Sequence, residues 1–116
     1  MFGLNSQHRF FLYPEVCDMR KGFDGLSGIV SISMQKDILS GDVFIFINRP
    51  RNRMKLLQWQ QGGFVLYYKR LEQGTFEYFE GEDKEILWTD LVMLIEGINI
   101  EKSKKRKRYL SKKNVN

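Results

Sequence analysis

The segment that most constrains the fold is residues 42–71, where long apolar runs are separated by strong turn signals. Residues 42–48, Asp-Val-Phe-Ile-Phe-Ile-Asn, are nearly all apolar, which is typical of a central strand. The sequence Asn-Arg-Pro-Arg-Asn at 48–52 predicts a turn, because proline cannot continue a paired strand. Gln61-Gly62-Gly63 predicts a tight reversal, since glycine accepts a positive φ angle. The segment is therefore predicted to form three consecutive antiparallel strands.

The other elements follow from the spacing of apolar residues. We predict strands at 9–16, 42–48, 53–60, 64–71 and 75–79, and helices at 23–39 and from 89 onward. The first helix has apolar residues at three-to-four spacing, and Thr89 suits the N-cap of the second. The expected fold class is α+β, with an antiparallel meander sheet of about four to five strands packed with two helices.

Charge divides the chain into a domain and a tail. Residues 1–101 carry 11 Lys and Arg against 14 Asp and Glu, whereas residues 102–116 carry 8 Lys and Arg and no acid. We therefore expect a single α+β domain at 1–101 and a basic tail with little fixed structure at 102–116. Residues 80–85 are expected to form an acidic loop within the domain.

Positive charge is concentrated at residues 49–70, which hold six basic side chains and no acidic one. A two-residue turn at Gln61-Gly62 predicts a specific register for the hairpin. The predicted pairs are Gln60–Gly63, Trp59–Phe64, Leu57–Leu66, Lys55–Tyr68 and Arg53–Arg70. Because side chains alternate along a strand, the last four pairs share one face, which is apolar near the turn and cationic farther from it.

Clustered cations repel one another unless something compensates them, and the sequence leaves two sources open. One is the chain's own acidic segment at 72–85, folding back over the hairpin. The other is external: the phosphates of a nucleic acid or an acidic protein surface. The run Lys-Lys-Arg-Lys-Arg at 104–108 predicts salt-dependent contact with phosphates that is independent of base sequence.

Residues typical of catalytic and metal sites are sparse. His8 is the one histidine and Cys17 the one cysteine, so neither a His/Cys metal site nor an internal disulfide is expected. Cys17 lacks an activating signature and is expected to be an inert, partly buried thiol. Asp18, Asp24 and Asp42 could in principle converge on a metal ion, but we predict no metal, no cofactor and no enzymatic activity.

The sequence also indicates the cellular compartment in which the protein is expected. It has no run of about 18 apolar residues that could span a bilayer, and residues 1–8 lack the layout of a signal peptide. With a single cysteine, the simplest expectation is a soluble cytoplasmic protein without a membrane partner.

Four blocks carry a family resemblance: Tyr13–Leu26 (Y-P-E-V-C-D-M-R-K-G-F-D-G-L), Gly41–Trp59 (G-D-V-F-I-F-I-N-R-P-R-N-R-M-K-L-L-Q-W), Gly63–Phe76 (G-F-V-L-Y-Y-K-R-L-E-Q-G-T-F) and Leu91–Ile98 (L-V-M-L-I-E-G-I). In this order they resemble the small accessory protein of insertion sequences of the IS sixty-six class, often called TnpB. That protein is unrelated to the RNA-guided nucleases that share the name.

The resemblance implies a helper of DNA transposition that acts beside a separate, larger transposase of the same element, and that transposase is expected to carry the catalytic acidic triad. Among positions matching the family's motifs, Phe23, Leu26, Leu57 and Trp59 are expected in the core. The candidate residues for binding DNA or the transposase are Arg20, Lys21, Arg49, Arg51, Arg53, Lys55, Tyr68, Lys69, Arg70, Lys104, Lys105, Arg106, Lys107 and Arg108.

Two functional hypotheses follow. In the first, the protein is a non-catalytic transposition factor whose basic hairpin docks on DNA or on the transposase, while the tail adds non-specific attraction to DNA. In the alternative, the chain is a protein–protein interaction module that binds no nucleic acid directly, and its positive face meets an acidic surface of the transposase.

Overall fold

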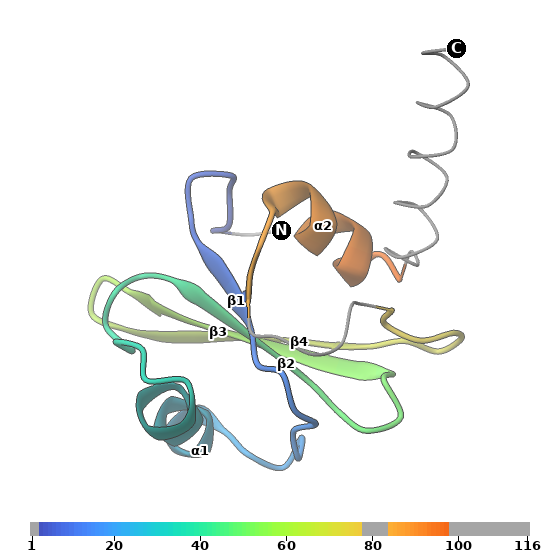
Figure 1. Ribbon diagram of the computed structural model, residues 1–116, viewed down its shortest axis with the longest axis horizontal. Coiled ribbons are helices and arrows are strands. Elements are labelled where there is room, and N and C mark those ends of the chain that lie inside the picture. The colour runs from blue at the N-terminus through green and yellow to red at the C-terminus, as the bar shows by residue number, and fades with distance from the viewer. Residues whose placement is uncertain (1–2, 78–83, 98–116) are drawn as a thin grey trace.

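A five-stranded sheet with the strand order β4-β3-β2-β1-β5 is the frame of the molecule (Figure 1). The computed structural model describes residues 3–77 and 84–97. Its elements are β1 (Phe10–Leu12), α1 (Phe23–Gly28), the π-helical turn η1 (Ile29–Ser33), β2 (Val43–Ile47), β3 (Arg53–Gln60), β4 (Gly63–Arg70), β5 (Lys84–Ile86) and α2 (Trp88–Ile95). The α+β class predicted from the sequence is confirmed.

The sheet is mixed, so the prediction of a purely antiparallel meander is wrong in one place. Strands β2, β3 and β4 form the predicted antiparallel succession, but β1 pairs in parallel with β2, with Phe10 opposite Val43. The physical reason is the connection between them. The chain leaves β1, crosses one face of the sheet through α1 and η1, and returns in the same direction, as parallel neighbours require.

Helices cover both faces of the sheet, with α1 on one side and α2 on the other (Figure 1). On the α2 side, the buried core includes Phe10, Ile45, Met54 and Leu94. The core on the α1 side is built from Phe11, Leu26, Val30, Phe44, Phe46 and Leu57. All five residues of β2 are buried, because successive side chains enter opposite cores. This explains the unbroken apolar sequence of β2 and confirms it as a central strand.

The register predicted for the hairpin is confirmed at every position. Gln60 lies opposite Gly63, Lys55 opposite Tyr68 and Arg53 opposite Arg70. Gly62 supplies the positive φ angle of the turn, at +88°. The ring centroids of Trp59 and Phe64 lie 5.0 Å apart, so the end of this face next to the turn is aromatic.

The predicted helix at 23–39 is too long. The helical segment ends at Ser33, and Gln35 has a φ angle of 54°, a left-handed conformation that ends a right-handed helix. Ser31, Ile32 and Ser33 are weak helix formers, so propensity does not carry the helix further. Phe23 was expected in the core but is 46% exposed at the start of α1.

The structure differs from three predictions near the C-terminal end of the domain. The described part of the predicted strand at 75–79 is not a strand. The fifth strand is instead β5, which begins within the segment predicted to be an acidic loop and pairs antiparallel with β1. Helix α2 begins at Trp88, and Leu87 rather than Thr89 occupies the N-cap position. Three residues are too few for a periodic signal, so β5 is set by its pairing with β1 rather than by its own sequence.

The predicted tail at 102–116 and residues 80–83 of the predicted acidic loop lie outside the described residues. Between residues 3 and 77 and between 84 and 97, no helix is both long enough and apolar enough to cross a bilayer.

The packing of α1 predicts a strong dependence of stability on Leu26, which is fully buried, whereas Ile32 is 79% exposed. We expect Leu26→Ala to lower the free energy of unfolding by about 2–5 kcal/mol, because it leaves a cavity in the core on the α1 side. The control, Ile32→Ala, should change it by less than about 0.5 kcal/mol. Urea unfolding of the full chain measures both. Equal effects of the two substitutions would contradict the burial of Leu26 in the core on the α1 side.

Candidate functional site

The six cations of residues 49–70 do not form one exposed surface. Alternation along the strands sends Lys55 to the α1 side of the sheet and Lys69 to the α2 side. Lys55 is only 6% exposed, so its expected exposure is wrong. The cluster seen in the sequence therefore separates into groups with different surroundings.

The ammonium group of Lys55 joins the sheet to the loop at residues 17–21. Its Nζ donates hydrogen bonds of 2.7 Å to the carbonyl oxygens of both Met19 and Lys21. The ring of Tyr68 covers the same ammonium, with its centroid 4.7 Å from Nζ. Burying a charge is costly unless it is hydrogen-bonded, and the two carbonyls and the aromatic face provide that compensation.

The loop is shaped to present these carbonyls. The Cys17 N–H donates to Ile47 O at 2.9 Å, which attaches the start of the loop to the end of β2, and the Lys21 N–H donates to Asp18 O at 3.1 Å, which closes a turn. The turn leaves the carbonyls of Met19 and Lys21 available to Lys55. We call this arrangement the Lys55 clasp.

Lys69 has a comparable internal partner on the opposite face. Its Nζ donates a 2.7 Å hydrogen bond to the carbonyl oxygen of Ile95, the last residue of α2. A cation at a helix C-terminus satisfies a free carbonyl and interacts favourably with the helix dipole. Lys69 therefore attaches α2 to the sheet, and its side chain is half-buried there rather than fully exposed on the hairpin surface.

Two of the arginines are compensated by the chain's own acidic segment. Nη2 of Arg70 lies 2.8 Å from Oε1 of Glu72, and Nη1 of Arg51 lies 3.6 Å from Oε2 of Glu77. The Arg51 backbone is fixed as well, since its carbonyl accepts a 2.6 Å hydrogen bond from the Phe76 N–H. Internal compensation, one of the two sources left open by the sequence, therefore accounts for these two cations.

Arg20 is paired within its own loop. Its guanidinium donates to both carboxylate oxygens of Asp18, with a shortest contact of 2.7 Å, and its backbone N–H donates to Asp18 Oδ1 at 2.8 Å. These hydrogen bonds hold the pKa of Asp18 at about 2, below its usual range. The pair is exposed, so Asp18 orients the Arg20 side chain and offsets its charge.

Arg49 and Arg53 are the hairpin cations left without an ion pair among the described residues. They line an open depression of about 550 Å³ between the loop and the β2–β3 turn. Its walls are Cys17, Asp18, Met19, Arg20, Asn48, Arg49, Pro50, Asn52 and Arg53, and we call it the arginine cleft. Arg49 is exposed, and half-buried Arg53 donates a 3.3 Å hydrogen bond to the Tyr68 hydroxyl.

The turn that carries Arg49 is ordered by two asparagines that the sequence analysis did not single out. The Asn48 side-chain oxygen accepts hydrogen bonds of 3.0 Å from the Asn52 and Arg53 N–H groups. The Asn48 amide donates to the Asn52 side chain at 2.9 Å. Asparagine at both ends of the turn was the available signal, because its side chain commonly bonds nearby backbone in turns. The network holds Arg49 and Arg53 at the same side of the cleft.

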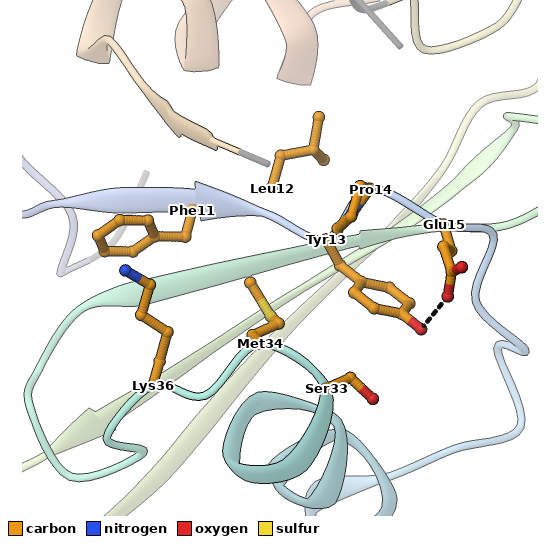
Figure 2. A pocket seen from close by; sticks show the side chains of 8 residues that line it. All are labelled: Phe11, Leu12, Tyr13, Pro14, Glu15, Ser33, Met34 and Lys36. Carbon is orange, nitrogen blue, oxygen red and sulfur yellow. Dashed lines mark hydrogen bonds between the residues drawn. The ribbon is translucent and has the colours of Figure 1, made fainter. Parts of the chain in front are cut away.

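A second, apolar pocket of about 330 Å³ lies between the end of β1 and η1 (Figure 2). Phe11, Tyr13 and Met34 form much of its wall. The Tyr13 hydroxyl donates to Glu15 at 2.9 Å, and Lys36 Nζ lies 4.1 Å from the centroid of the Phe11 ring. Burial and the neighbouring Glu15 raise the pKa of Tyr13. The pocket was not predictable from the sequence, because the crossover through α1 brings its two walls together.

The remaining candidates have different surroundings. Lys21 is exposed beside the clasp, and Tyr68 is about half exposed above Lys55. The tail residues Lys104 to Arg108 lie outside the described residues. Cys17 is 4% exposed, as expected for a buried thiol, and burial raises its pKa. Within the described ranges, no group of three or more His, Cys, Asp and Glu side chains gathers where a metal ion could be held.

The Lys55 clasp predicts that Lys55→Met destabilises the protein even though the new side chain suits a buried position. The free energy of unfolding should fall by roughly 2–4 kcal/mol, because two carbonyls lose their charged donor. The released loop should also expose Cys17, so its alkylation should accelerate. Arg53→Met, the same change two residues away, should cost less than about 1 kcal/mol. Unchanged stability and unchanged Cys17 alkylation in Lys55→Met would contradict the clasp.

The chain is similar to one known protein family and to two curated proteins. The sequence model described as IS66 Orf2 like protein matches residues 8–105. Two curated proteins of Sinorhizobium fredii (strain NBRC 101917 / NGR234) are similar. The uncharacterized protein y4jC is 25% identical over 91% of this chain and 92% of its own length. The uncharacterized protein y4hO is 34% identical over 71% of this chain and 73% of its own length. No solved structure matches the chain. The chain belongs to the family of IS66 Orf2-like proteins.

Proposed function

We propose that this protein is a non-catalytic accessory factor of insertion-sequence transposition that contacts DNA phosphates through the arginine cleft. Membership of the IS66 Orf2-like family supports an accessory role in transposition. The observation that carries the proposed contact is the meeting of two sequence blocks at one cleft. The loop of the first block supplies Arg20, and the turn of the second supplies Arg49 and Arg53.

The chemistry of the cleft suits a phosphate backbone. Guanidinium groups bind phosphate oxygens through planar pairs of N–H donors, and they remain charged at any physiological pH. The cleft carries three arginines against one carboxylate, that of Asp18, so it retains positive charge. Its open shape suits an extended chain of phosphates better than an enclosed small molecule.

The binding surface that we propose is therefore smaller than the basic hairpin predicted from the sequence. Lys55 and Lys69 hold the fold together, and Arg51 and Arg70 face carboxylates. Arg49 and Arg53 provide the contacts we propose, Arg20 and Lys21 lie beside them, and the half-exposed Tyr68 ring borders Arg53. The tail residues at 104–108 add salt-dependent, non-specific attraction to DNA.

The transposase of the same element is the second partner we propose. An acidic protein surface would recognise the same cations, so a protein interface at the arginine cleft is the alternative to a DNA contact. The DNA contact and the protein interface differ in which partner each of them requires. A phosphate contact survives in a mixture of this protein and DNA alone, whereas a protein contact requires the transposase.

We expect Arg49→Glu combined with Arg53→Glu to weaken DNA binding by the full chain and to lower the slope of log affinity against log salt by about 2, because each lost phosphate contact removes roughly one unit. Transposition should fall in parallel. The control is Arg9→Glu combined with Lys36→Glu, which makes the same charge change at two cations that flank the Phe11 ring. Binding titrations at several salt concentrations, with circular dichroism to verify folding, make the comparison.

Three outcomes decide between the alternatives. Loss of DNA binding in the cleft variant but not in the control supports the phosphate contact. Normal DNA binding with lost transposition, accompanied by lost co-purification with the transposase, supports the protein interface. Normal transposition by a folded cleft variant would refute a functional role for the arginine cleft.

A further inference from the structure

Strand β4 forms one edge of the sheet and is unusually open for an edge strand. Among the described residues it pairs with β3 alone, and the register runs one to one from Gly63 to Arg70 without a bulge. Edge strands in monomeric proteins are commonly short, bulged, interrupted by proline or protected by charge. The sequence Gly-Phe-Val-Leu-Tyr-Tyr-Lys-Arg has no proline and keeps its cations at one end.

Those two cations give the edge little protection. The Lys69 ammonium is bound to the carbonyl of Ile95 on the α2 side, and Arg70 is paired with Glu72. Apart from Arg70, the exposed side chains along the strand are apolar or aromatic, with Val65 at 44% and Tyr68 at 48%. An edge of this length with such a composition is a template for pairing with another strand.

The backbone groups that point away from β3 follow from the hairpin geometry. A two-residue turn makes Gln60 and Gly63 a hydrogen-bonded pair, so odd-numbered residues of β4 face β3. The Leu71 N–H continues this alternation by donating to Asn52 O at 2.8 Å. The N–H and C=O groups of Phe64, Leu66, Tyr68 and Arg70 therefore point outward.

We infer that β4 pairs antiparallel with β4 of a second copy of this chain, forming a two-fold symmetric dimer with a continuous sheet. The distribution of charge along the strand favours a second copy of this chain as the partner and an antiparallel direction of pairing. Antiparallel self-pairing places the basic end of each strand beside the uncharged Gly63–Phe64 end of the other. Parallel self-pairing would bring Arg70 beside Arg70 of the other copy, and like charges directly opposite one another are destabilising.

One register satisfies all the outward groups at once. Pairing Leu66 with Tyr68 and Phe64 with Arg70 of the other copy uses every outward N–H and C=O of the strand. In this register Tyr67 lies opposite Tyr67 at the two-fold axis, as a pair without hydrogen bonds. Val65 then lies opposite Lys69 of the other copy. The surface is self-complementary, as a two-fold symmetric interface requires.

Engineered cysteines test the register. In a Tyr67→Cys variant of the full chain, the two introduced cysteines should have Cα atoms about 4.5 Å apart, within the range of a disulfide. Mild oxidation should then give a covalent dimer on a non-reducing gel. In a Val65→Cys variant the equivalent positions should lie about 13 Å apart along the strands, so no covalent dimer should form. Cross-linking of Val65→Cys but not of folded Tyr67→Cys would overturn this register.

The oligomeric state tests the interface without relying on the Tyr67 variant, whose side chain packs against the core. We expect the wild-type chain to sediment as a dimer over a concentration series, and Val65→Lys to sediment as a monomer because it faces Lys69 of the other copy. The control, Ile32→Lys, makes the same kind of change at an exposed site away from the edge and should remain dimeric. A wild-type chain that is monomeric throughout, or a Val65→Lys variant that remains dimeric, would overturn the inference.

Discussion

The buried ammonium of Lys55 is the interaction that holds the loop carrying Arg20 against the sheet. It reaches from the sheet to two carbonyls of the loop at 17–21, and the Tyr68 ring covers it. Hydrogen bonds to a charged group contribute about 1.5–3 kcal/mol each, and they add to the contacts that Cys17 and Met19 of this loop make with the core on the α1 side. Because the same loop carries Arg20, the clasp also sets the distance between Arg20 and the turn that carries Arg49.

The contrast between Lys55 and Arg53 shows how far the sequence could locate the site. Alternation along β3 assigned both side chains to the same face, and that assignment is confirmed by the register. How deeply a side chain is buried depends on which segment packs over that face of the sheet. Lys55 is covered by the loop that contains Lys21, whose carbonyl group comes from 34 residues earlier in the chain. Arg53 lies two residues farther along and borders the open cleft instead. Periodicity identifies the face of a strand, but it does not reveal which part of that face another segment covers.

The elements of the fold show the same contrast, because some follow from local sequence signals and others from contacts with distant segments of the chain. The register of the hairpin was predictable to the residue because Gly62 and the flanking alternation are local signals, although the second strand spans Gly63–Arg70 rather than 64–71. The parallel pairing of β1 was not, because a short strand has the same pattern whether its neighbour runs parallel or antiparallel. Strand β5 is an extreme case, since three residues become a strand only through β1. The two asparagines of the β2–β3 turn fall between these cases, because the turn was evident but its side-chain network was not.

The dimer inferred from β4 would change how the arginine cleft meets a partner. Two antiparallel strands in one sheet are related by an axis perpendicular to that sheet, so both α1 faces would point the same way. Arg53 lies on that face, on the strand next to β4, and each copy would therefore present its cleft on the same side of a continuous sheet. Two separated groups of arginines on one side suit a long polyanion that contacts both, because the second contact becomes intramolecular and raises the overall affinity. The small number of free cations in one cleft is then no obstacle to binding DNA, since the dimer would double the number of phosphates contacted.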